Sequence, residues 1–251
     1  MKNYNSDIAY EYIRKRIIGE EFAPRLPLMT EALATAIGIS RTPVRDALRK
    51  LEADGLVSIR PRLGACVKRM DMKEFYEICE VRIALEGHAA GLASKNRTDA
   101  ELEEIQYALN AMEAIAKKIE GETDEHSLPD LIREDVRFHV AIIKAAKNDL
   151  LKSEIIRLHI VNRITSETMV PRDVRMARDT LAPKKSRDER RKAVHGHHAK
   201  IFAAIERGSA AAAKRAMEFH LEEAIRSLRN MISHAKLTLR EPSNDEMSYS
   251  A

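Results

Sequence analysis

Three arginines near the N-terminus recur at a spacing that suits DNA binding. Arg41, Arg45 and Arg49 stand four residues apart, so on a helix their guanidinium groups line one face over two turns. A guanidinium group binds phosphate oxygens and the acceptor edge of guanine in the major groove. The spacing alone does not separate such a DNA-reading face from a basic helix surface that only contacts solvent.

One aspartate and three histidines form a second set, with the chemistry of a metal site. Asp135 and His139 are spaced i, i+4 and project from one helix face. His198 lies ten residues before Gly208, and His220 lies twelve residues after it. In an antiparallel helical hairpin that rises about 1.5 Å per residue, these two imidazoles return to nearly the same height. Such a set can bind a divalent transition metal (Zn, Ni, Mn or Fe), although the chain has nine histidines and chance alignment is the alternative.

The arginines require a short helix that exposes them, and residues 40–55 predict one. Ser40 is a suitable N-cap and Gly55 a suitable terminator. Val44, Leu48 and Leu51 recur at i, i+4 and i+7, which predicts a buried stripe on a different face from the arginines.

The segments on either side predict a winged helix-turn-helix. Residues 30–38 form a second short helix, whose apolar face carries Leu33 and Ile37, and a tight turn joins it to the arginine-bearing helix. Residues 56–67 predict two short strands around a basic turn. Such a hairpin is a wing that can reach a neighbouring minor groove.

The stretch from Ile8 to Val67 resembles the winged-helix domain of the GntR family of bacterial transcription regulators. It carries Ser-Arg-Thr-Pro-Val-Arg at 40–45, then Ala-Leu, Leu-Glu and Gly-Leu-Val up to residue 57. In two places the chain departs from common members: Arg25 follows Pro24 in place of glycine, and Glu31 stands where some members have arginine. The operator of those members therefore does not transfer. The resemblance implies that these residues contact DNA: Arg41, Thr42, Arg45, Arg49, and in the wing Arg62 and Gly64.

The remainder of the chain predicts helices, so the fold class is mainly α with a small β wing. A helix over 4–20, with Ile8, Tyr12 and Ile17 turned inward, precedes a loop at 22–27 that contains two prolines. No fixed-period repeat follows, which favours a compact all-α bundle over a solenoid. The predicted bundle helices span 72–95, 99–120, 128–147, 149–169, 172–182, 187–207 and 210–236. The polar tail, 237–251, is expected to be disordered.

Residues 71–236 resemble the FCD (FadR C-terminal) ligand-binding domain of one large GntR subfamily. The matching segments are Val81-Arg82 with Leu85-Glu86, Asp135-Val-Arg-Phe-His139, His198-Ala-Lys-Ile201 and Met217-Glu-Phe-His220-Leu221. The resemblance implies that Asp135, His139, His198 and His220 bind a metal, which holds a small carboxylate effector. It leaves open whether the bundle is of the six- or seven-helix type.

Three further residues are candidates for contact with the effector. Arg82 matches the arginine by which family members grip an acid, although its position also suits a solvated helix arginine. Asn162 places an amide on an otherwise apolar helix face, which a buried structural hydrogen bond explains equally well. His195 is three residues before His198 and is expected to line the pocket. His197 is about 100° around the helix from His198 and is the weaker ligand candidate.

Composition and charge agree with a DNA-binding chain. Of its 251 residues, the first 70 carry 13 Lys and Arg against 8 Asp and Glu, while the remainder carry 30 against 31. The positive charge therefore lies where DNA contact is predicted. No apolar run approaches the ~20 residues needed to span a bilayer, and no secretory signal is found, so a cytoplasmic location is expected. Cys66 and Cys79 lack zinc-ligand spacing and are expected to be reduced thiols.

These observations predict a homodimeric transcription regulator, not an enzyme. Residues 1–70 would bind a palindromic double-stranded operator, and residues 71–236 would dimerise and sense a small organic acid at a metal. Repression is the expected outcome, with activation as the alternative. Two other functions stay open: a metal-dependent hydrolase that uses the Asp and three His to activate water, and a sensor of the metal itself.

Overall fold

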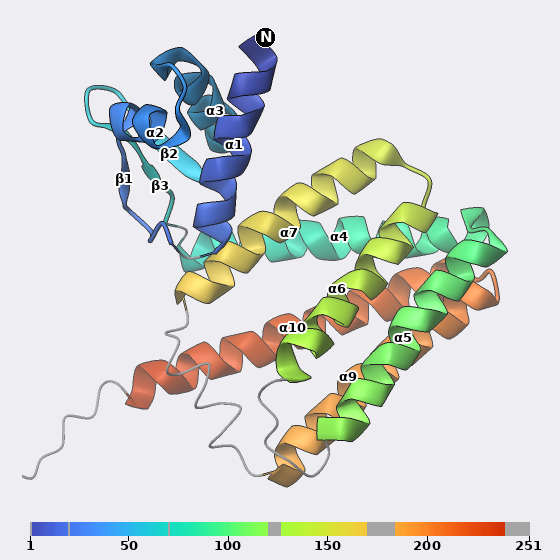
Figure 1. Ribbon diagram of the computed structural model, residues 1–251. Coiled ribbons are helices and arrows are strands. Elements are labelled where there is room, and N and C mark those ends of the chain that lie inside the picture. Colours follow the sequence, from blue (N-terminus) through green and yellow to red (C-terminus); the bar gives the residue numbers. More distant parts are fainter. Residues whose placement is uncertain (1, 20, 70, 120–126, 170–183, 239–251) are drawn as a thin grey trace, which may run out of the picture. The chain divides into compact units, whose positions relative to one another are not determined.

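A computed structural model describes residues 2–19, 21–69, 71–119, 127–169 and 184–238 (Figure 1). By its internal contacts the chain divides into two compact units. One unit comprises Met1–Cys79 with Glu154–Met169, and the other comprises Glu80–Ser153 with Val170–Ala251. The domain limits expected from the sequence, 1–70 and 71–236, stay a prediction.

The first unit contains a winged helix-turn-helix. Its two short helices, α2 and α3, are joined by a turn in which Gly38 adopts a φ of 77°. The wing is an antiparallel hairpin of β2 and β3, and β3 also pairs with β1, so the strand order is β1-β3-β2. The bounds are α1 Lys2–Ile18, β1 Pro27–Leu28, α2 Thr30–Ile37, α3 Arg41–Ala53, β2 Val57–Arg60 and β3 Gly64–Val67. The mainly α fold with a small β wing is thereby confirmed.

The apolar stripe of α3 is buried as predicted. Val44, Leu48 and Leu51 are all buried, and α3 packs against α1 and β2. The inward face predicted for α1 is partly wrong, because Ile8 is 38% exposed. Ile17 is buried as predicted and Tyr12 is partly buried, and the other residues of the buried face are Ala9 and Ile13. The predicted loop over 22–27 also ends in a short strand, since β1 begins at Pro27.

The second unit holds most of a helical bundle. The helices from α4 onward agree with the predicted spans to within three residues at each described end, although the start of α4 and most of α7 belong to the first unit. The predicted helix over 172–182 lies outside the described residues. The last helix runs to Thr238, so residues 237 and 238 are helical rather than disordered, and 239–251 lie outside the described residues. The bounds are α4 Met72–Asn96, α5 Asp99–Ile119, α6 Leu128–Ala145, α7 Asp149–Met169, α9 Lys184–Glu206 and α10 Ala210–Thr238.

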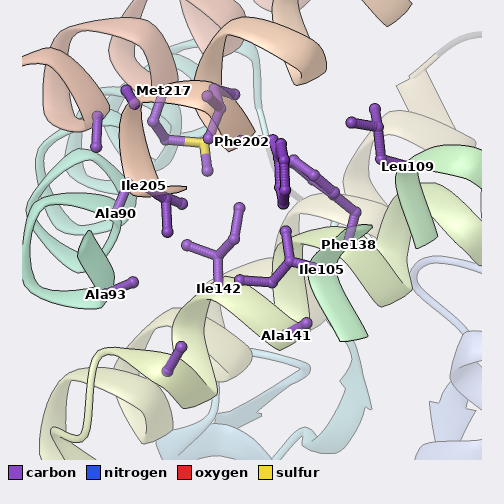
Figure 2. Packing of buried hydrophobic residues seen from close by; sticks show 14 of the residues in the cluster. Ala90, Ala93, Ile105, Leu109, Phe138, Ala141, Ile142, Phe202, Ile205 and Met217 are labelled. Atoms are coloured by element: carbon purple, nitrogen blue, oxygen red, sulfur yellow. The ribbon is translucent and has the colours of Figure 1, made fainter. Parts of the chain in front are cut away.

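One apolar core joins five helices of this unit. Phe138 and Ile142 of α6 are fully buried, as are Ile105 of α5, Ile205 of α9 and Ala213 of α10. Figure 2 shows side chains from α4, α5, α6, α9 and α10 converging on this interior. Burial of apolar area at about 25 cal/mol per Å² is the main stabilising term for such a bundle.

The end of α4 ties the bundle together through hydrogen bonds. Asn96 donates from Nδ2 to the carbonyl of Ala146 (3.0 Å), just after α6. Arg97 donates to the carbonyls of Ile205 (3.2 Å) and Glu206 (2.7 Å), at the end of α9. The last carbonyls of a helix lack partners within the helix, so these two side chains cap the ends of α6 and α9.

Helices α4 and α10 approach each other closely where Gly87 lies. A Cβ atom at Gly87 would come within 2.7 Å of Cγ of Glu218 on α10. A side chain at position 87 would therefore force Glu218 to move, and the neighbouring residue Glu86 is buried.

None of the helices in the described part of the chain combines the length and the apolar character needed to cross a bilayer.

Candidate functional site

The outer face of α3 presents all four of its predicted DNA-contacting residues to solvent. Arg41, Thr42, Arg45 and Arg49 are exposed, and the side chains of Arg41 and Arg49 are 61% and 75% exposed. The buried stripe on the opposite side of α3 holds the helix in place, so the arginines stand on a rigid element. This arrangement suits insertion of α3 into a major groove.

Carboxylates contact two of these arginines, which the arginine spacing did not reveal. Arg41 pairs with Glu31 of α2 (2.8 Å), and Arg49 lies 3.8 Å from Asp46 one turn earlier on α3. Within the residues that the structure describes, Arg45 makes no ion pair. The face is therefore less uniformly cationic than its arginines alone indicate, and Arg45 at its centre is exposed and has no carboxylate partner among the described residues.

The wing exposes its basic turn as predicted. Arg62 has a φ of 66° and Gly64 a φ of 83°, and Leu63 donates its amide hydrogen to the carbonyl of Arg60 (3.1 Å). Left-handed backbone at Gly64 favours glycine, and a Cβ atom there would meet nothing within 4 Å. Both wing residues that the resemblance assigns to DNA contact, Arg62 and Gly64, are therefore exposed to solvent at the tip.

In the second unit, the aspartate and the three histidines predicted to bind metal lie together. Asp135 and His139 come from α6, His198 from α9 and His220 from α10. One ligand atom from each residue lies within 4.8 Å of all the others. The i, i+4 spacing places Asp135 and His139 on one face of α6. The α9–α10 hairpin brings His198 and His220 to a similar height along its axis, as their distances from Gly208 predict.

The imidazoles pack against one another in the interior of the bundle. His139 Nε2 lies 3.2 Å from His220 Nε2, and the rings of His198 and His220 are 4.3 Å apart between centroids. His198 Nε2 lies 3.2 Å from Oδ1 of Asp135. All three histidines are buried, and Phe138 packs edge-on against His198. The three histidines are therefore shielded from water, whereas the side chain of Asp135 is 41% exposed.

At three of the four residues, the electrostatics favour the protonation state that binds metal. Burial opposes the charge on Asp135, but a hydrogen bond with His198 and the charges of the histidines outweigh it and hold the pKa of that carboxyl far below its usual range. Burial lowers the pKa of His198 and of His220. Burial also disfavours protonation of His139, but Glu86 and Asp135 outweigh it and raise its pKa. A carboxylate and two neutral imidazoles are already suited to a cation.

The residues present fit a divalent transition metal. Three nitrogens and one oxygen make a borderline donor set, and ligand atoms about 2 Å from one ion lie roughly 3–4 Å apart, so a limit of 4.8 Å requires only small shifts. Nε2 of His198 faces Oδ1 of Asp135, and Nε2 of His139 faces Nε2 of His220, both at 3.2 Å. Two imidazole nitrogens facing each other need a hydrogen or a cation between them, which fits a bound ion.

The structure describes the side chains of two of the three residues predicted to contact an effector. Arg82 is largely buried on α4 and donates from Nε to Oε1 of Glu86 (2.9 Å). His195 is partly buried on α9, and its charge influences the pKa of His198. The side chain of Asn162 lies outside the described part of α7. His197, the weaker ligand candidate, packs against Phe219 and lies 6.0 Å from His220 between ring centroids.

Glu86 is the residue beside the cluster that sequence reasoning passed over. It is 1% exposed, and its Oε2 lies 3.4 Å from Nδ1 of His139. The sequence contained one signal, since Glu86 follows Arg82 at i+4 and both belong to the segments that resemble the FCD domain. Its burial against a histidine of another helix could not be read from that spacing.

Family models match the two parts of the chain separately. Residues 5–67 match the family described as bacterial regulatory proteins, gntR family, and residues 77–223 match the FCD domain. Among curated proteins, the HTH-type transcriptional regulator LutR of Bacillus subtilis is 33% identical over 209 residues, which cover 76% of this chain and 85% of LutR. The HTH-type transcriptional repressor RspR of Escherichia coli is 27% identical, with 88% of each chain covered.

Solved structures share the fold. The Escherichia coli protein McbR/YncC gives a TM-score of 0.65 at 20% identity, covering 90% of this chain and 97% of McbR/YncC. A GntR transcriptional regulator from Rhodococcus sp. RHA1 gives a TM-score of 0.61 at 18% identity, covering 91% of this chain and 98% of that protein. At such identities the likeness concerns the fold alone.

Proposed function

The chain belongs to the GntR family of bacterial regulatory proteins, with an FCD domain, and from this membership we propose that it is an acid-responsive repressor. It is a DNA-binding transcription regulator and not an enzyme, as its family and relatives are. Repression is supported by RspR, a relative described as a transcriptional repressor. Since the partner is chromosomal DNA, the proposal places the protein in the cytoplasm, at the nucleoid.

The DNA-binding half of the proposal depends on the exposed face of α3. Arg41, Thr42, Arg45 and Arg49 would read the major groove, while Arg62 and Gly64 would follow the minor groove beside it. A single winged helix covers a short site, so a homodimer that reads two half-sites of a palindrome would supply the affinity of a specific regulator.

The sensing half depends on one observation, the four ligand atoms of Asp135, His139, His198 and His220 within 4.8 Å of one another. When bound, a divalent transition metal would supply a Lewis-acidic positive centre that attracts a carboxylate with a neighbouring hydroxyl or second carboxylate. The chain's own residues hold these ligands on three packed helices, with the three histidines buried and Asp135 partly exposed. Arg82, His195 and Asn162 are the proposed contacts to the acid.

Control of DNA binding follows from linkage. An acid that prefers one conformation of the dimer shifts the equilibrium by its difference in affinity for the two conformations, and no more. A tenfold loss of operator affinity requires about 1.4 kcal/mol of such preference. We propose that acid binding favours the conformation with lower operator affinity, which relieves repression.

A thermal-shift screen tests this function directly. The full-length protein is heated with a panel of small carboxylic acids, each with and without chelator, and every acid that raises the melting temperature is tested for release of DNA. The DNA is a sequence that the wild-type protein selects from a random pool. The expected result is stabilisation by a few related acids that chelator abolishes. If no acid stabilises the protein in either condition, the sensing proposal is wrong.

A sensor of the metal itself is the second candidate. It is favoured by the cluster alone, since four protein ligands complete a tetrahedral site and leave no position for an acid. Titrating metal and acid separately into the DNA-binding assay separates the two functions, because a metal sensor changes its DNA affinity when no acid is present.

A further inference from the structure

Glu86 is a buried acid that the proposed function has not used. We propose that Glu86 is the positioning residue of the metal site, which orients His139 and selects the ring nitrogen that faces the metal. This inference rests on the proposed metal site, because it assigns a role toward that site. It goes beyond the four ligands, since Glu86 would act on the metal only through His139.

The geometry places Glu86 and the cluster on opposite edges of one imidazole. Oε2 of Glu86 lies 3.4 Å from Nδ1 of His139, while Nε2 of the same ring lies 3.2 Å from Nε2 of His220. A neutral imidazole carries one hydrogen, so a ring that donates from Nδ1 to a carboxylate keeps the lone pair of Nε2 for a metal. Carboxylate–histidine–metal arrangements orient ligands in this way.

A buried carboxylate needs a counter-charge, and Arg82 supplies it. Arg82 is one helical turn before Glu86, its side chain is 13% exposed, and it donates from Nε to Oε1 of Glu86 (2.9 Å). The ion pair leaves Oε2 directed at His139 of α6. A pair that served only to hold α4 in shape would not need one oxygen directed at a histidine of another helix.

The packing of α4 fixes this arrangement. Gly87 lies so close to α10 that a side chain there would meet Glu218, and Glu86 is 1% exposed. Glu86 therefore has little freedom to turn away from His139. The distance of 3.4 Å is slightly beyond an ordinary N–H···O hydrogen bond, so the proposal requires the imidazole to turn toward Glu86.

The first test measures metal affinity in the full-length protein. Co²⁺ and Zn²⁺ are titrated in competition with a chromophoric chelator into wild type, Glu86→Gln and Glu86→Leu. Glu86→Leu removes the acceptor and is expected to weaken binding about 10- to 100-fold. Glu86→Gln retains an acceptor oxygen but not the charge, so it should fall between wild type and Glu86→Leu.

A matched control is available in Glu134→Gln. Glu134 is also a buried carboxylate, lies next to Asp135 in the sequence, and pairs with Arg133 and Arg137. The substitution changes the charge in the same way without removing an acceptor from His139. The metal affinity of Glu134→Gln should match that of wild type. If Glu86→Leu binds metal within about twofold of wild type, the proposal is wrong.

The second test needs no metal. Long-range proton–nitrogen NMR correlations at alkaline pH identify which nitrogen of His139 carries the hydrogen in the metal-free protein. We expect Nδ1–H in wild type and in Glu86→Gln, and loss of this preference in Glu86→Leu. The same tautomer in all three proteins would overturn the proposal. A wild-type protein that binds neither metal would overturn the metal site instead, and the tautomer would then decide the role of Glu86.

Discussion

Glu31 and Arg41 form an ion pair on the surface that is expected to meet DNA. Their side chains are exposed and lie 2.8 Å apart, with Glu31 on α2 and Arg41 on α3. A surface pair of this kind contributes only about 0–1 kcal/mol to stability. Its larger effect falls on binding, because the carboxylate competes with DNA phosphate for the guanidinium group and repels the phosphate itself.

Replacing Glu31 by glutamine should therefore strengthen DNA binding with little change in folding. We expect Glu31→Gln to raise affinity for random-sequence DNA by about two- to fivefold, and to steepen the dependence on salt by roughly one counterion. Fluorescence anisotropy over a range of salt concentrations measures both. Glu11→Gln, which breaks a pair with Arg14 on α1 and changes the charge equally, is the control. If both variants bind alike, Glu31 does not restrain Arg41.

Spacing along one helix predicted which residues share a face, but not which residues of other helices contact them. The i, i+4 relation of Asp135 and His139 places both on one face of α6, because helix geometry fixes that direction. The partners of Arg41 and His139 could not be predicted, because Glu31 and Glu86 reach them from other helices. Contacts between helices depend on packing that spacing along one helix does not contain.

At the scale of elements, a hydrogen bond joins α1 to the end of α3. The hydroxyl of Tyr10 donates to Oδ2 of Asp54 (2.7 Å), and Lys50 also pairs with Asp7 of α1 (2.7 Å). Burial first, and then the hydrogen bond to Asp54, raise the pKa of Tyr10 well above the usual value for a tyrosine. Loss of that hydrogen would leave two negative charges facing each other.

Tyr10→Phe should lower the free energy of unfolding by about 1 kcal/mol near neutral pH. Because the folded protein holds the phenolic hydrogen more tightly than the unfolded chain, the contribution of Tyr10 is complete below about pH 10 and is lost as the pH rises above that. Denaturant unfolding of wild type and variant across this range should show their difference shrinking. Tyr4→Phe, at an exposed tyrosine, is the control. A difference that does not depend on pH would contradict this role.

The end of α4 offers a second test at this scale. Arg97 caps α9 through the carbonyls of Ile205 and Glu206, and Arg97→Ala leaves both without this donor. We expect a loss of about 1–3 kcal/mol in the unfolding free energy of the metal-free protein, measured by denaturant titration. Lys95→Ala, at an exposed site two residues earlier, should cost much less. Equal losses would mean that the cap contributes nothing specific.

Element boundaries were predictable where the residues carry local signals. Gly38, Gly55 and Gly208 all adopt left-handed backbone where helices end, and each marks a predicted boundary. The inner face of α1 was not predictable, because Ile8 and Ile13 are both apolar and the choice between their faces depends on the elements packed against them. The two-residue strand β1 has too few residues to show any period, and its pairing with β3 defines it.

At the scale of the whole molecule, charge and chemistry divide along the chain. The first 70 residues carry 13 Lys and Arg against 8 Asp and Glu, and the remainder are nearly balanced. The exposed arginines of α3 belong to the first unit, and the aspartate and three histidines belong to the second. Each function therefore has its own residues, and a substitution in one should spare the other.

Reciprocal substitutions test that separation. Arg45→Ala should weaken binding to the selected DNA by about 1–3 kcal/mol, since one guanidinium contact is lost, but leave the Zn²⁺-dependent rise in melting temperature unchanged. His220→Ala should remove most of that rise and leave the DNA affinity of the metal-free protein unchanged. In the wild type, Zn²⁺ at 100 times its dissociation constant would stabilise the folded protein by about 2.7 kcal/mol. Gel shift and calorimetry measure the two quantities on the same preparations. If either substitution lowers both by similar amounts, then DNA binding and metal binding share one folding unit, and the effector cannot act by shifting an equilibrium between two otherwise intact parts.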